Sequence, residues 1–198
     1  MKVSKRLAIM AAAVGAGVGF GSQARAATYY WDVDAGAGFG TGSGTVSWLT
    51  NNWTTDATGA AAVGAWAQGN DAVFDAGSGA YTVAPSTATP IVANGLYFQQ
   101  GTVSLILATA SDNPGLHLRN GIAVPTVSVA SGAVGLINTY KVVAPIGFNK
   151  TGDGLLSFGG SSTVGNLDVR GAIGVKEGTR AAERSAANPA PTERTGSA

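Results

Sequence analysis

Apolar and polar residues alternate over short segments along most of this chain. The clearest segments are 95–99, 102–108, 115–118, 126–130 and 133–137. Residue pairs typical of turns separate them, namely Gln100-Gly101, Asn120-Gly121 and Ser131-Gly132. An alternation with a period of two predicts strands that bury one face. Because no helical pattern lies between these strands, they must bury their apolar sides on one another, and we expect an all-β fold.

Residues 148–160 combine a turn with a strand. Asn149, Gly152 and Gly154 are predicted to take the positive-φ or tight positions of the turn, and residues 155–158 form a short apolar strand. The segment that follows repeats this plan. Its expected inward-facing residues are Val164, Leu167, Val169 and Ile173.

These residues also carry a resemblance to a known family. The series Lys150-Thr151-Gly152-x-Gly154-Leu155-x-Ser157-x-Gly159, with Thr163-Val164 and Val169-x-Gly171-x-Ile173 after it, resembles the autotransporter-associated β-strand repeat. The match covers about thirty residues. In that family the repeat lies in exported passenger regions that resemble right-handed parallel β-helices. The resemblance therefore implies such a β-helix here, although the strand spacing also allows an antiparallel β-sandwich.

A second resemblance lies upstream. The series Trp48, Asn52-Trp53, Gly69-x-Asp71-Ala72-Val73-Phe74-Asp75 and Tyr81-x-Val83 is similar to the N-terminal segment that commonly precedes such repeats in exported bacterial proteins. Self-translocating members also carry an outer-membrane barrel, for which the residues after 178 leave no room. We therefore expect a short or truncated member, secreted or held at the cell surface or in the periplasm of a Gram-negative-type bacterium.

The chain divides into four predicted parts. Residues 1–26 have a basic start, an apolar run and an Ala24-Arg25-Ala26 site, which is the pattern of a signal peptide. Residues 27–79 form an aromatic-rich N-terminal cap, and residues 80–178 form the β-solenoid, with the repeat at 148–173. Residues 179–198 contain no valine, isoleucine, leucine or aromatic residue and are predicted to be a disordered tail.

Charge and composition narrow the class of partner. Removing the four basic residues of the predicted signal peptide changes the formal net charge from +1 to −3, which argues against nucleic acid. We expect no cofactor and no integral membrane segment after signal cleavage. A cell-surface or matrix polysaccharide is the expected partner. The last coil, near Ile173, would be open, so end-to-end self-association is also expected and is testable by light scattering.

Catalytic patterns are mostly missing from the sequence. His117 is the one histidine, and no Gly-x-Ser-x-Gly elbow occurs, so we expect no enzyme activity. Asp32 and Asp34 would face one side of a strand about 7 Å apart, as in a polysaccharide-active β-helical enzyme or a calcium site. Asp71 and Asp75 form a second pair. The favoured interpretation is that Asp34 and Asp75 begin turns by accepting backbone hydrogen bonds.

The tryptophans are the remaining candidates for a site. All four lie before residue 70, at Trp31, Trp48, Trp53 and Trp66. They could stack on sugar rings in a carbohydrate-binding module, or they could cap the first open coil, which a solenoid requires. The requirement for a cap favours the second interpretation. The leading hypothesis is thus an exported, non-catalytic structural or adhesive module.

Overall fold

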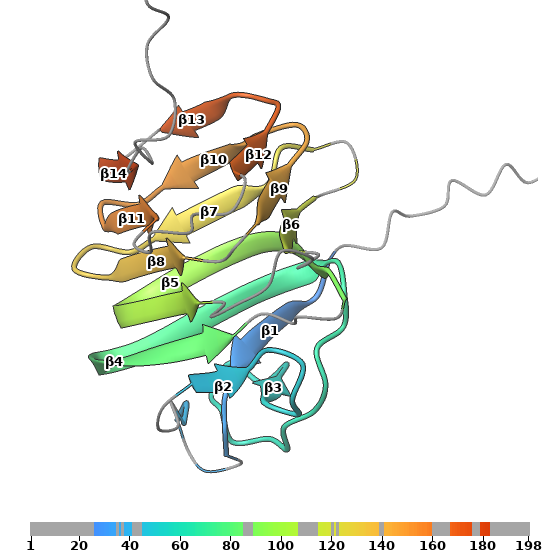
Figure 1. The fold of residues 1–198 in the computed structure, drawn as a ribbon. Coiled ribbons are helices and arrows are strands. Elements are labelled where there is room, and N and C mark those ends of the chain that lie inside the picture. The colour runs from blue at the N-terminus through green and yellow to red at the C-terminus, as the bar shows by residue number, and fades with distance from the viewer. Residues whose placement is uncertain are drawn as a thin grey trace, which may run out of the picture.

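The computed structural model describes residues 26–34, 36, 38–40, 45–84, 89–106, 115–119, 121, 123–138, 141–159, 167–175 and 179–182. These residues form an all-β structure, in which no helix occurs (Figure 1). The strands are β1 (Thr28–Trp31), β2 (Thr45–Ser47), β3 (Trp53–Thr54), β4 (Asn70–Ala84), β5 (Ile91–Ile106), β6 (Leu116–Leu118), β7 (Thr126–Val129), β8 (Val134–Asn138), β9 (Val142–Ala144), β10 (Phe148–Thr151), β11 (Leu155–Phe158), β12 (Leu167–Val169), β13 (Ile173–Val175) and β14 (Thr179–Ala182). The predicted signal peptide lies outside the described residues except for Ala26.

Parallel pairing organises the sheet. β4 pairs in parallel with β5, and β5 then pairs in parallel with β6, β7 and β8 along its length. Each of these three strands begins a column, and the columns are β6–β9–β12, β7–β10–β13 and β8–β11–β14. Figure 1 shows the three columns rising from the β4–β5 layer. Among the named strands, the antiparallel pair is β1 with β3, so the sheet is mixed. An antiparallel sandwich does not match this pairing.

The core lies on the inner side of the columns. Residues in register stack on one another, as Ile91 does on Leu116 and Leu116 on Val142. The Phe74 and Phe98 rings stack with centroids 5.4 Å apart. Leucine, valine and phenylalanine side chains at every second strand position are buried, which confirms the predicted alternation. The buried inward-facing residues of β5 to β8 are Ile91, Ala93, Leu96, Phe98, Val103, Leu105, Leu116, Leu118, Val127, Val129 and Ile137.

One charged residue belongs to this interior. Lys150 on β10 is in register with Val127 and is fully buried. Its ammonium group donates a hydrogen bond to the backbone oxygen of Gly152. Gly152 has a φ of 74°, and a Cβ on Gly154 would lie 2.2 Å from the Ala130 oxygen, so both glycines occupy the predicted turn positions.

Asn149 is not a turn residue, which corrects the sequence-based expectation. It lies in β10 and pairs with both Thr126 and Gly174. Backbone pairing on two sides outweighs the turn preference of an asparagine side chain, which lies over Gly174 on the outer face. Two other boundaries also differ. The segments 95–99 and 102–108, predicted as separate strands, both contribute to β5, which pairs with β7 up to Phe98 and with β8 from Thr102. Residues Asn70–Ala84 likewise form one strand, β4, whose pairing with β5 has register shifts at the corner.

The predicted disordered tail begins too early. Residues Thr179–Ala182 form β14, which pairs in parallel with β11 from Leu155 to Phe158. Backbone pairing needs no large apolar side chain, so composition did not reveal this strand. Residues 183–198 lie outside the described part of the chain, as does Val164. Val169 and Ile173 are half-buried and pack against the core, as predicted.

Candidate functional site

The four tryptophans gather in one cluster, which we call the tryptophan cluster. Trp31 ends β1, Trp53 begins β3, Trp48 follows β2, and Trp66 lies between β3 and β4. Ring centroids are 5.2 Å apart for Trp31 and Trp53, 4.7 Å for Trp53 and Trp66, and 5.3 Å for Trp48 and Trp66. The Trp53 Nε1 donates a hydrogen bond of 2.8 Å to the Trp48 backbone oxygen. Aromatic contacts and one buried hydrogen bond therefore hold the cluster together.

This cluster covers the end of the core that precedes β4. The Trp48 and Trp53 rings lie 5.4 and 5.6 Å from the ring of Phe74, which stacks on Phe98. The exposed fractions of the four residues range from 0% to 8%. A sugar ring stacks on an exposed aromatic face, and these indoles offer none. Their position favours the cap and gives no support to sugar stacking on Trp31, Trp48, Trp53 and Trp66.

A neighbouring tyrosine extends the buried aromatic region. Tyr81 of β4 stacks near Trp31, with centroids 6.3 Å apart. Burial raises the pKa of the Tyr81 hydroxyl well above 10.0, and the charge of Asp75 contributes in the same direction. Tyr81 therefore stays neutral over the physiological range of pH.

The predicted carboxylates serve mainly as local hydrogen-bond acceptors. An oxygen of Asp34 accepts from the backbone N–H of Gly36 at 2.9 Å, and Asp75 accepts from that of Gly77 at 2.8 Å. Both residues thus begin turns, which confirms the favoured interpretation. Asp71 accepts from the Asn94 side-chain amide at 2.6 Å. Asp32 differs from these three because it is fully buried.

His117 lies on the outer side of β6, because Leu116 and Leu118 beside it are buried in the core. In register, it neighbours Val143, which in turn neighbours Asp168. Within the part of the chain that the structure describes, no group of three His, Cys, Asp or Glu side chains converges as metal ligands would. His117 therefore belongs to no such group among these residues.

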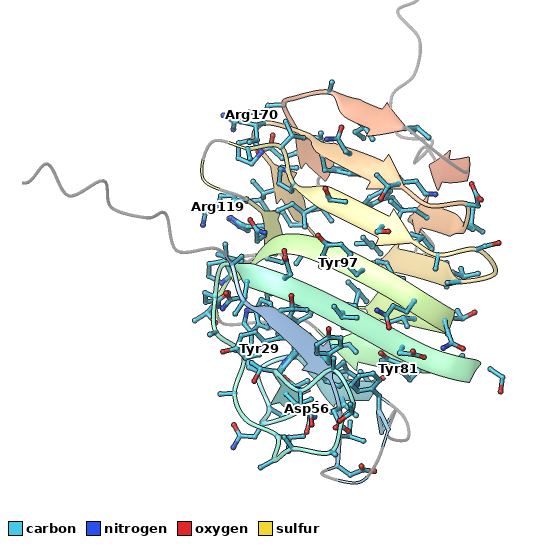
Figure 2. All side chains as sticks on the ribbon, turned by 180° about the vertical axis from the view of Figure 1, so that it is seen from behind. Tyr29, Asp56, Tyr81, Tyr97, Arg119 and Arg170 are labelled. Atoms are coloured by element: carbon cyan, nitrogen blue, oxygen red, sulfur yellow. The ribbon has the colours of Figure 1, made fainter. Side chains whose placement is uncertain are left out.

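Three exposed or half-buried cations line the outer side of the β6–β9–β12 column. We call this set the basic face, and it consists of Arg119, Lys141 and Arg170. Arg119 directly follows β6, Lys141 precedes β9 and Arg170 follows β12. Figure 2 shows Arg119 and Arg170 on the same side of the molecule. Among the basic side chains whose burial the structure describes, Lys150 is buried and the three of the basic face are exposed or half-buried.

One carboxylate lies on the basic face. Arg170 Nε and Nη2 lie 3.1 and 3.3 Å from the two oxygens of Asp168. Hydrogen bonding to Arg170 lowers the pKa of Asp168, and the charges of Arg170 and Lys141 add to this effect. Of the other described carboxylates, those at residues 32, 34, 56, 71 and 75 lie in the N-terminal half of the chain, and Asp153 lies in the turn between β10 and β11. The basic face was not predicted from the sequence. Its sequence signal is that Arg119 and Arg170 follow strands of the same column.

Comparisons with known proteins identify no relative of this chain. No family model, no curated protein and no solved structure matches the chain. The described residues also include no helix with the length and apolarity that a membrane crossing requires.

Proposed function

We propose that the chain is a β-solenoid module, resembling a right-handed parallel β-helical passenger fragment, with a structural or adhesive role and no catalytic site. The observation that carries this proposal is the parallel register of the three strand columns. Each strand of a column pairs with the equivalent strand further along the chain, which is how coils of a solenoid stack. The tryptophan cluster supplies the cap that such a stack needs at its first coil.

The motif supports membership of the autotransporter-associated repeat family. Lys150 and Gly152, two positions of the motif, are joined by a hydrogen bond inside the core. Gly152 takes a positive φ that other residues rarely adopt. The motif residues thus have structural reasons for their identity. Export rests on the signal-peptide pattern of residues 1–26.

A non-catalytic role is favoured by how the candidate carboxylates are used. Asp34 and Asp75 hold turns, and Asp71 is bound to Asn94. A glycosidase needs one carboxyl that can donate a proton and one free carboxylate facing the same bond. Asp32 is fully buried and Asp34 holds a turn, so these two do not supply both groups, and the buried tryptophans offer no sugar platform.

The adhesive surface that we propose is the basic face, and the partner is an acidic polysaccharide. Among the described residues, Arg119 and Lys141 make no ion pair, so their charges are available to a ligand. Arg119 and Arg170 follow β6 and β12, which lie two strands apart in the column, so their backbones are about 10 Å apart, and Lys141 lies at the opposite end of these strands. A linear polymer of carboxylated sugars presents repeated negative charges that can contact cations separated in this way.

The double variant Arg119→Gln, Lys141→Gln is expected to bind polygalacturonate about tenfold more weakly than the unmodified chain, since two exposed charge contacts contribute up to about 1 kcal/mol each. Binding is measured by biolayer interferometry at low salt. Raising the salt concentration should weaken binding of the unmodified chain, and neutral dextran should not bind.

A charge-matched control variant distinguishes an effect of the basic face on binding from an effect of net charge. The variant Asn51→Asp, Gln99→Glu also lowers the net charge by two but changes exposed residues away from this face. It is expected to bind nearly as well as the unmodified chain. Equal weakening in the two variants, or no binding by the unmodified chain, would contradict the proposed partner.

A further inference from the structure

The side chain of Asp32 is only partly satisfied by the protein. It directly follows Trp31 at the end of β1 and is fully buried. Its Oδ1 accepts hydrogen bonds from the backbone N–H groups of Asp34 at 3.1 Å and Gly40 at 2.9 Å. Its Oδ2 is buried and has no hydrogen-bond partner among the described residues.

Burial of the Asp32 carboxylate is unfavourable unless water or an ion binds the free Oδ2. Burying a carboxylate oxygen without a partner costs free energy because the oxygen loses its hydration. Such orphaned atoms in folded proteins commonly mark a bound water or ion. No basic side chain of the described residues forms an ion pair with Asp32.

A second carboxylate lies against the same short loop. Asp34 uses Oδ1 to accept from the Gly36 N–H at 2.9 Å. A Cβ on Gly40 would lie 2.7 Å from the Asp34 Oδ2, and the Gly40 N–H is bound to the Asp32 Oδ1. Asp32 and Asp34 therefore both adjoin Gly40, and any side chain at Gly40 would displace Asp34.

The donor set indicates the kind of ligand. Both side chains offer oxygen alone, and two negative charges held near one loop favour a divalent cation. Oxygen donors suit Ca²⁺, whereas Zn²⁺ prefers nitrogen and sulfur. Because no third carboxylate, histidine or cysteine joins them among the described residues, backbone carbonyls and water would complete the shell.

We propose that Asp32 and Asp34 bind a Ca²⁺ ion, which neutralises the buried carboxylate and fixes the loop after β1 against the tryptophan cluster. With two carboxylates, the expected dissociation constant is that of weak extracellular sites, about 10⁻⁴ to 10⁻³ M. This site is independent of the basic face and of any polysaccharide.

Thermal unfolding of the full chain tests the proposal. After treatment with EDTA, addition of 10 mM CaCl₂ is expected to raise the Tm by about 3–10 °C, and NaCl of equal ionic strength is not. Terbium provides a second readout, because the indole of Trp31, the residue before Asp32, can sensitise Tb³⁺ luminescence. Calcium should then displace the terbium signal.

Three variants test whether Asp32 and Asp34 hold the calcium ion. Asp32→Asn and Asp34→Asn are expected to remove both the calcium-induced Tm shift and the terbium signal. Asp34 is exposed, so Asp34→Asn remains informative if Asp32→Asn fails to fold. Asp153→Asn changes an exposed carboxylate in a distant turn and is expected to keep both responses. An unmodified chain without a calcium response, or an Asp34→Asn variant that retains the full response, would overturn the proposal.

Discussion

Trp53→Ala is expected to lower the free energy of unfolding by about 3–5 kcal/mol, which is the range for truncating a large buried aromatic residue. Trp53 is 1% exposed and its ring contacts those of Trp31, Trp66 and Phe74. The substitution also removes the hydrogen bond that Trp53 donates to the buried backbone oxygen of Trp48. A cap that closes the core should respond this strongly, whereas a surface platform for sugars should not.

Leu49→Ala is the control for this experiment. Leu49 adjoins Trp48 in the sequence but is 41% exposed, so its truncation should change stability by no more than about 0.5 kcal/mol. Urea unfolding followed by far-UV circular dichroism measures both variants without relying on tryptophan fluorescence. A loss below about 1 kcal/mol for Trp53→Ala would show that the tryptophan cluster does not close the core.

Gly152→Ala is expected to destabilise the chain by at least about 3 kcal/mol, and Gly132→Ala by about 1–2 kcal/mol. Both glycines have positive φ, 74° and 77°, so both substitutions carry the cost of a left-handed backbone with a Cβ. The two positions differ in the space that is available to an added Cβ. A Cβ on Gly152 would lie 2.2 Å from the backbone oxygen of Val129, whereas nothing lies within 4 Å of one on Gly132. The difference between the two variants therefore measures how closely the 152–154 turn packs on β7.

Both glycine variants are measured by the same urea unfolding experiment. The comparison is matched because the residue change and the sign of φ are the same. If Gly152→Ala cost no more than Gly132→Ala, the close approach of the 152–154 turn to Val129 would be wrong. The packing of this turn on the preceding strand of the same column would then need revision.

The sequence predicted the buried side of the strands well. Alternating residues such as Leu96 and Phe98 face the core because a strand turns successive side chains to opposite sides. Whether neighbouring strands run parallel could not be derived from this alternation, since it is the same in both arrangements. The sequence also predicted separate strands on the two sides of Gln100-Gly101, whereas the structure has one strand, β5. Gly101 has a φ of 64° and lies between the part of β5 that pairs with β7, which ends at Phe98, and the part that pairs with β8, which begins at Thr102.

Candidate sites were harder to predict than the core. The turn roles of Asp34 and Asp75 followed from local sequence, because each accepts from a backbone N–H two residues later. Burial of the tryptophans followed from the need for a cap. The basic face could not be predicted, since Arg119 and Arg170 lie far apart in the chain and meet only through the register of β6, β9 and β12.

Engineered cysteine pairs test the stacked parallel columns most directly. The chain contains no cysteine, so each pair is the sole source of a disulfide. Ser128 pairs with Thr151, and Leu136 pairs with Ser157, in two different columns. Neighbouring strands place such residues about 4.8 Å apart, within the range that a disulfide spans.

If the columns are stacked in parallel, the Ser128→Cys, Thr151→Cys variant and the Leu136→Cys, Ser157→Cys variant each form a disulfide on mild oxidation of the folded chain. Mass spectrometry after proteolysis identifies the disulfide. A mixed variant, Ser128→Cys with Ser157→Cys, joins different columns and should remain reduced. Failure of both in-register pairs to oxidise, together with ready oxidation of the mixed pair, would contradict the stacked parallel arrangement.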